Sequence, residues 1–348
     1  MNSSQVRVSS PWWIPTAVAM LVLALLGGAM IGPAGPTWWR VPLELLNRLP
    51  LLTVHSGVSE SEWNIIWLVR MPRVVLAGLV GCTLSIAGAS YQGVFRNPLV
   101  DPYLLGVAAG AGLGATFVFT INRAGSSTWL IDPLPLAAFG CGLAAVLVTY
   151  VVGTAFGGER SSTTLVLAGV AVTSLVTAMQ AFLLQRHTDV MREVYSWILG
   201  RLSTATWTDV RLVLPYVALS TTVLLFHRRL LDVLRVGDDE ATALGAHVNR
   251  IRLVVVLFAT LGTAAVVAVS GLIGFVGIIV PHAVRLLVGA SYRVVLPLSF
   301  LLGGAFLITA DIPGRILSNP AETPIGVVTA FLGAPFFLLI LRTRQASR

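Results

Sequence analysis

The sequence predicts an all-α integral membrane protein with about ten transmembrane helices, and two observations carry this prediction. The 348 residues are 56% hydrophobic and only 11% charged, with a mean hydropathy of +0.85. A soluble domain of ordinary composition carries roughly 25% charged residues. The apolar residues also gather in runs of about 20, the length that crosses a bilayer as a helix. Because lipid cannot bond the backbone, such runs are expected to form helices rather than open strands.

Ten runs of suitable length follow one another along the chain. The weakest boundary lies between 251 and 289, where VSGLIGFVG carries three glycines. The first run follows a polar start, as in a signal peptide, but the many later runs favour a transmembrane helix. No linker divides the chain, so a single domain over 1–348 is expected. The predicted spans are 13–31, 73–94, 103–121, 133–156, 164–185, 208–227, 251–270, 272–289, 294–311 and 324–341.

The charged residues exclude several classes of protein. All 23 basic side chains are arginine, so the chain cannot contain a P-loop, and ATP-driven work would need a separate ATPase. The fifteen acids all fall in expected loops or at helix ends, which disfavours a proton-coupled carrier. A secondary carrier remains an alternative, because backbone carbonyls can bind sodium. The five histidines are isolated and both cysteines lie in apolar runs, so neither a metal site nor a membrane enzyme is expected.

Arginine placement predicts the orientation in the membrane. A cytoplasmic N-terminus puts thirteen of the 23 arginines on the cytoplasmic side, a modest bias that also makes the C-terminus cytoplasmic. The arginines stand at the ends of apolar runs, so the basic balance favours a membrane protein over a nucleic-acid-binding one.

One polar segment, LRVGDDEATALGAHVNRIR at 234–252, interrupts the apolar chain between the sixth and seventh runs. We expect a helix of about seven residues that begins at Gly237 or Asp238 and ends at Gly245. Ala241 and Leu244 are three apart and are predicted to share one apolar side. So short a helix is unstable alone in water, so it should rest on another surface. It is either a docking element for a soluble subunit or an ordinary solvated loop.

Several long motifs resemble the FecCD family, the permeases that import iron siderophores, haem and vitamin B12. LVRMPRVVLAGLVGCTLSIAGASYQGVFRNPLVDPYLLGVAAGAGLGA (68–115) is similar to the family almost throughout. SSTTLVLAGVA (161–171), GLIGFVGIIVPHAVRLLVG (271–289) and AETPIGVVTAFLGAPFFLLIL (321–341) follow in the family's order. WILGRL (197–202) departs from the pattern by placing Arg201 where the family has serine.

The resemblance implies a ten-span permease that works as a homodimer or paired permease in the cytoplasmic membrane of a bacterium. Two ATPase subunits, which bind ATP and magnesium, dock on a cytoplasmic coupling loop at 228–252, and a substrate-binding protein docks outside. The permease itself binds no cofactor, metal or nucleic acid and has no catalytic residue. A ferric siderophore is the expected cargo, with haem and cobalamin as alternatives.

The resemblance also assigns roles to residues. Arg70, Arg73 and Arg315 match docking positions for the binding protein, since arginine grips carboxylates with two hydrogen bonds. Asn97, Leu99, Ser162 and Thr163 match a cytoplasmic gate, although Asn97 also has ordinary turn chemistry. A helix-packing role is expected for Gly274, Phe275, Gly277, Pro281, His282 and Arg285. The ATPase-coupling positions are Leu234, Gly237, Asp238, Glu240, Ala241, Leu244 and Gly245.

Overall fold

The computed structural model describes residues 12–33, 35–48, 56–121, 132–155, 162–317 and 321–345, and every regular element in these ranges is a helix. Helix η1 is a π-helix and η2 a 3-10 helix. The elements in order are α1 (Trp13–Met30), α2 (Arg40–Asn47), α3 (Glu60–Asn64), η1 (Ile65–Arg70), α4 (Met71–Val94), α5 (Val107–Ile121), α6 (Pro133–Ala155), α7 (Ser162–Arg186), η2 (Thr188–Val190), α8 (Met191–Ile198), α9 (Trp207–Phe226), α10 (Arg228–Leu234), α11 (Asp238–Ala243), α12 (Val248–Ser270), α13 (Val276–Val288), α14 (Tyr292–Ile316) and α15 (Ile325–Gln345).

Each of the ten apolar runs coincides with an apolar helix, which confirms the all-α membrane fold. Seven helical stretches in the described chain are long and apolar enough to cross a membrane. The longest, Glu60–Val94, joins α3, η1 and α4 without a break, so it starts well before the predicted span at 73. Helices α5, α13 and the apolar part of α15 are shorter.

Helix α4 lies at the centre of the molecule and packs against α12, α13 and α14. Its most apolar stretch is 89% buried, far more than that of the peripheral α1 or α7. Small residues make this packing possible, because glycine lets helix backbones approach closely. A Cβ atom on Gly81 would collide with the Gly303 carbonyl of α14, and one on Gly88 would collide with Gly277 of α13.

The weakest predicted boundary, near VSGLIGFVG, is a real break in the helix. Gly271 ends α12 with a φ of +70°, a conformation that glycine adopts at little cost. The chain then runs without helix to Phe275, whose φ of +69° opens α13. Two separate helices therefore occupy the glycine-rich stretch.

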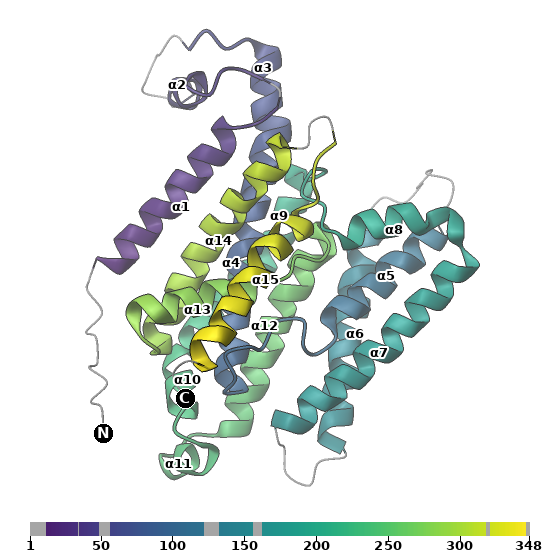
Figure 1. Ribbon diagram of the computed structural model, residues 1–348, viewed down its shortest axis with the longest axis vertical. Coiled ribbons are helices and arrows are strands. Elements are labelled where there is room, and N and C mark those ends of the chain that lie inside the picture. The colour runs from purple at the N-terminus through teal and green to yellow at the C-terminus, as the bar shows by residue number, and fades with distance from the viewer. Residues whose placement is uncertain are drawn as a thin grey trace.

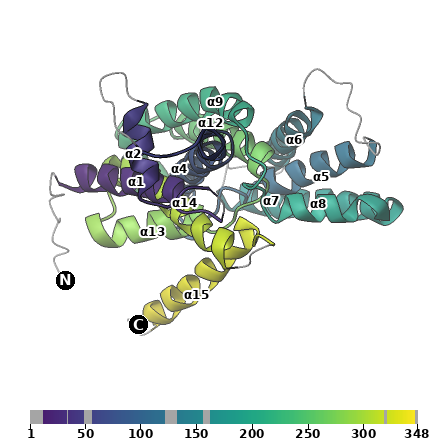
Figure 2. The same cartoon turned by 90° about the horizontal axis from the view of Figure 1, so that it is seen from above.

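The two ends of the bundle carry different short helices (Figure 1). Helices α2, α3 and α8 lie at one end, and α10 and α11 lie at the other. Helices α5 to α8 form one side, while α1, α13 and α14 form the opposite side, with α4, α9 and α12 between them. Seen from above, α15 points away from the rest of the bundle (Figure 2); its main helix contacts are with α13 and α14, and its Gly326 N–H donates to the Leu199 carbonyl after α8 at 2.9 Å.

Candidate functional site

A buried ion-pair cluster lies at the end of the bundle that carries α2 and α8 (Figure 1). Asp311 of α14 is 1% exposed and accepts from Arg73 of α4 through both oxygens, at 2.8 and 2.9 Å. Arg315, one turn further along α14, donates its Nε to the same carboxylate at 2.7 Å. Glu322, just before α15, accepts from Arg73 Nη1 at 2.7 Å. The cluster therefore connects α4, α14 and the start of α15.

The position of Asp311 corrects the expectation that every acid lies in a loop or at a helix end. Helix α14 continues to Ile316, so Asp311 lies inside it. The carboxylate is tolerated there because two guanidinium groups surround it and bond both of its oxygens.

Arg70 occupies a neighbouring position at the end of η1. Its guanidinium donates to the carbonyl oxygens of Ala29, Met30 and Gly32 at 3.2 to 3.4 Å, where α1 ends. Arg70, Arg73 and Arg315 are thus brought together, but they are only 6%, 8% and 3% exposed. Their bonds go to the protein's own oxygens, so their docking to a binding protein stays a prediction.

The predicted coupling loop at 228–252 forms two short helices at the opposite end of the bundle, α10 and α11, and α11 lies within the polar segment (Figure 1). Gly237 precedes α11 with a φ of +134°, and Gly245 follows it with a φ of +83°, so glycine suits both ends of this helix. Leu234 and Ala241 are buried, at 1% and 0% exposure. These contacts seat the segment on the bundle, as a helix of six residues requires.

The prediction that Ala241 and Leu244 share one apolar side is wrong. Leu244, which directly follows α11, is 72% exposed, and Val236, two residues before α11, is 56% exposed. Leu244 follows the last residue of α11, and the chain turns immediately at Gly245, whose N–H donates to the Thr242 carbonyl at 2.9 Å. The turn leaves the leucine side chain outside the protein.

Asp238 joins the polar segment to two other parts of the chain. Its Oδ2 lies 3.1 Å from Nη2 of Arg252, a buried residue of α12. Its Oδ1 lies 3.0 Å from Nη2 of Arg96, in the connection between α4 and α5. This ion pair therefore links α11 to that connection. The predicted coupling segment did not include Arg96, and nothing in the sequence spacing pairs it with Asp238.

The connection between α4 and α5 carries the predicted gate residues Asn97 and Leu99. Asn97 Oδ1 accepts from the Leu99 N–H at 3.0 Å, and Asp101 Oδ1 accepts from the Tyr103 N–H at 2.8 Å, which is ordinary turn chemistry. Burial raises the pKa of the Asp101 carboxyl to about 6, although the Tyr103 N–H acts in the opposite direction. Ser162 begins α7, but the side chains of Ser162 and Thr163 lie outside the described part.

The proposed packing motif at 274–285 lies along α13 and its start. An added Cβ on Gly277 would lie 2.9 Å from the Leu84 carbonyl of α4, while one on Gly274 would have nothing within 4 Å. Pro281 is buried inside the helix, and the His282 ring meets Phe336 of α15 edge-on at 6.0 Å. Arg285 donates to Gln92 Oε1 of α4.

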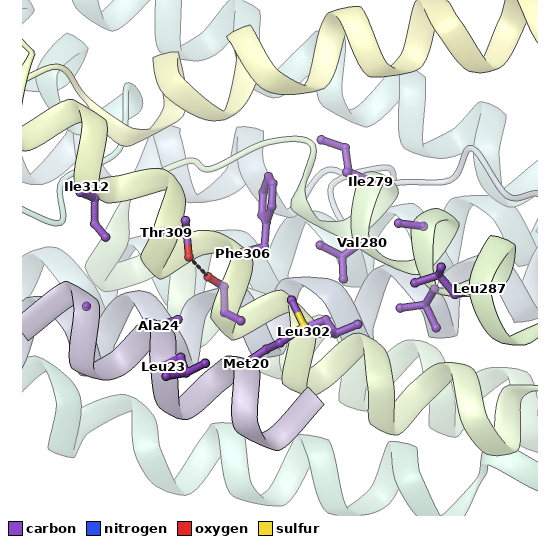
Figure 3. A pocket seen from close by; sticks show the side chains of 14 residues that line it. Met20, Leu23, Ala24, Ile279, Val280, Leu287, Leu302, Phe306, Thr309 and Ile312 are labelled. Carbon is purple, nitrogen blue, oxygen red and sulfur yellow. Dashed lines mark hydrogen bonds between the residues drawn. The ribbon is translucent and has the colours of Figure 1, made fainter. Parts of the chain in front are cut away.

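An apolar groove of about 630 Å³ lies between α1, α13 and α14 (Figure 3). Met20 and Leu23 come from α1, Val280 from α13 and Phe306 from α14. Its polar lining group Thr309 donates to the Ala305 carbonyl of its own helix at 2.8 Å. A groove so lined suits hydrocarbon, and it offers a polar chelate almost no hydrogen bonds.

Three relatives resemble this chain over most of its length. It is 38% identical to the cobalamin import system permease protein BtuC of Halobacterium salinarum, over 96% of both chains. It is 38% identical to the hemin transport system permease protein HmuU of Yersinia pestis, over 84% of this chain and 87% of that protein. It is 36% identical to the iron(3+)-hydroxamate import system permease protein FhuB of Bacillus subtilis, over 84% of this chain and 74% of that protein.

A solved structure of an inward-facing metal-chelate type ABC transporter superposes with a TM-score of 0.82. The two sequences are 27% identical, and the match covers 96% of this chain and 100% of that one. The model of the FecCD transport family matches residues 19–343, from the first half of α1 almost to the end of α15. This chain therefore belongs to the FecCD transport family and is a permease subunit of an ABC importer.

Proposed function

We propose that this chain is the membrane-spanning subunit of an importer that carries a ferric siderophore across the cytoplasmic membrane. The observation behind the cargo is the set of relatives: a hydroxamate permease and a metal-chelate transporter both match over most of this chain. Cobalamin is the second candidate, because the cobalamin permease matches 96% of both chains. Haem is the third, from the hemin permease.

In this proposal a separate ATPase supplies the energy. The chain contains no lysine, so it cannot form a phosphate-binding P-loop of its own. Two ATPase subunits, each with ATP and magnesium, bind the cytoplasmic ends of two permease copies. Both termini are cytoplasmic, and the loaded binding protein docks at the end that carries α2 and α8.

The coupling surface in this proposal is the exposed part of α11 and its flanks. Leu244 and Val236 are exposed apolar side chains beside three consecutive acids, whereas Ala241 and Leu234 hold the segment to the bundle. Apolar anchors ringed by charge are typical of protein interfaces. Asp238 then passes movement of α11 to Arg96 and the gate connection.

Substitutions in this surface test the coupling role. We expect Leu244→Asp, Glu240→Arg and Gly245→Val to lower ATP-dependent uptake by about tenfold or more, because each alters the docked face or its left-handed turn. Co-purification of the ATPase gives the matched control: Leu46→Asp in α2, where the leucine is 42% exposed at the other end of the bundle, should leave ATPase binding unchanged, whereas the three coupling variants should weaken it. Normal uptake by all three coupling variants would contradict the assignment.

The proposed function is tested by purifying the tagged chain from its host grown without iron. Recovery of an ATPase in equal amount, with vanadate-sensitive hydrolysis, supports the importer. The cargo follows from whether the co-purified binding protein takes ferric hydroxamate, haem or cobalamin. Uptake by the chain alone in liposomes, abolished by an ionophore, would instead establish a secondary carrier.

A further inference from the structure

A second cavity, of about 250 Å³, lies at the end of the bundle that carries α10 and α11. Its wall comes from four parts of the chain: the end of α4, the connection after it, the residue after α10, and the junction of α13 and α14. Tyr292 and Gln92 are buried at its base, at 6% and 1% exposure. A water molecule takes roughly 30 Å³ of the liquid, so the cavity has room for a small polar group.

The lining of this cavity is strongly cationic. Arg96, Arg235 and Arg285 line it, and no acid is among its described lining residues. Asp238 faces both Arg96 and Arg252, and Asp232 faces both Arg235 and Arg293, so two arginines share each of these carboxylates. Such a cavity attracts an anion, since surrounding protein screens charge less than water does.

Two of these arginines are held in place by hydrogen bonds within the protein. Arg235 Nη1 donates to the Ala290 carbonyl at 2.9 Å, and Arg285 donates to Gln92 Oε1. Gln92 is itself fixed, because its Nε2 donates to the Val100 and Gly277 carbonyls at 3.2 and 2.9 Å. These contacts hold guanidinium groups from different parts of the chain around the same cavity.

Arg96 adds an independent observation. It follows the end of α4 with a φ of +50°, and the next N–H, of Asn97, donates back to the Gln92 carbonyl at 3.2 Å. Glycine or asparagine usually occupies this left-handed position at a helix end. An arginine there is strained, and its side chain lines the cavity.

We propose that this cavity binds a phosphate group, either the headgroup of an anionic phospholipid or a free phosphate. The guanidinium fork bonds two phosphate oxygens at once, and arginine-rich pockets between membrane helices suit lipid headgroups. The site uses Arg96, Arg235, Arg285 and the Tyr292 hydroxyl. Because Arg96 also bonds Asp238, an occupant would stiffen the link between α11 and the gate connection. The site does not depend on which chelate is carried.

Calorimetry on the full chain in a non-ionic detergent tests this site, with short-chain phosphatidylglycerol and inorganic phosphate as separate probes. We expect one or both to bind, and Arg235→Gln to weaken binding by about tenfold, as loss of one charged hydrogen bond predicts. The double variant Arg235→Gln, Arg285→Gln should abolish binding. Arg235 is exposed, so the single variant should fold even if the double variant does not.

The matched control is Arg229→Gln, which removes one exposed charge from α10 without touching the cavity. Binding of phosphatidylglycerol alone identifies a membrane lipid as the source, and binding of inorganic phosphate alone identifies a free anion. Competition between the two probes shows that both bind at the same site through a phosphate group. Failure of both probes to bind, undiminished binding by Arg235→Gln, or an equal loss with Arg229→Gln would overturn the proposal.

Discussion

At the scale of single residues, the largest energies lie with buried charges that have partners. Asp311 bonds Arg73 and Arg315, and all three side chains are at most 9% exposed. Removing one partner of a buried ion pair leaves the other charge without compensation and costs roughly 3–5 kcal/mol. Glu322 is different, because its side chain is 34% exposed and water can replace its partner. The same type of arginine–carboxylate bond therefore contributes much more to stability at Asp311 than at Glu322.

Neutralising Asp311 is expected to destabilise the protein strongly. Asp311→Asn should lower the free energy of unfolding by about 3 kcal/mol or more, since the buried Arg315 loses its carboxylate partner and the buried Arg73 keeps only Glu322. Glu322→Gln should cost about 1 kcal/mol or less, as for a partly exposed pair. Thermal unfolding of the purified permease in detergent measures both. Equal losses of Tm would show that burial does not set the weight of these pairs.

Asp101 should make stability depend on pH. Its pKa is about 6 in the folded chain, above the ordinary value of 3.8, because burial opposes its charge. The folded state therefore holds its proton more tightly, and this contribution to stability is present below pH 3.8 and is lost as pH rises through about 6. Asp101→Asn keeps an acceptor for Tyr103 and has no charge. Its Tm should exceed that of the wild type above pH 7, and the gain should disappear near pH 4.

At the scale of helices, close backbone approach decides how the bundle packs. Helix α4 meets α13 at Gly88 and Gly277, and meets α14 at Gly81 and Gly303. Membrane helices gain little from hydrophobic burial against one another, so close van der Waals contact contributes much of their association. A single methyl group at such a crossing must separate two helices that the rest of the fold keeps together.

Two glycine-to-alanine substitutions should have opposite effects. Gly88→Ala is expected to lower the free energy of unfolding by about 1–3 kcal/mol, because its Cβ would overlap the Gly277 backbone. Gly140→Ala in α6 should raise it by about 0.4–1 kcal/mol, because nothing lies within 4 Å and alanine favours a helix. Thermal unfolding compares the two. Stabilisation by both would show that the α4–α13 crossing tolerates a side chain.

At the scale of the whole molecule, one copy leaves large apolar surfaces uncovered. Helix α15 leaves the bundle (Figure 2), and its Phe331 is 75% exposed. The most apolar stretch of α7 is only 28% buried. Lipid can cover such faces, but a protruding helix with few contacts of its own is also suited to packing against a second copy. We expect the α15 face to lie in a dimer interface.

Phe331→Arg should therefore convert a dimer to single copies, as measured by native mass spectrometry in detergent. The matched control is Phe117→Arg on α5, where the phenylalanine is 54% exposed; α5 belongs to the side of the bundle formed by α5 to α8 (Figure 1). Both substitutions place an arginine on a membrane helix, which costs roughly 2.5–3.5 kcal/mol in each variant. This free-energy cost therefore cancels when the two variants are compared. If both variants dissociate into single copies, or if neither does, the assignment of α15 to the dimer interface is wrong.

The sequence determined the number and order of the apolar helices, because the length of an apolar run is a local property. It also located the polar segment and the glycine break before α13, since charge and glycine act where they stand. Motif order alone identified the family. The sequence did not predict that Leu244 would be exposed, because the turn at Gly245 rather than helical spacing sets the direction of that side chain.

Only the tertiary structure decided which distant charges meet. Arg73 and Asp311 are 238 residues apart, and Arg96 reaches Asp238 from a different connection. Neither pairing leaves a periodic signal, because it depends on which helices become neighbours and how deeply each arginine is buried. The same holds for the cationic cavity, whose arginines come from three separate parts of the chain. Local chemistry fixed the helices, and packing between helices fixed the partners of their charges.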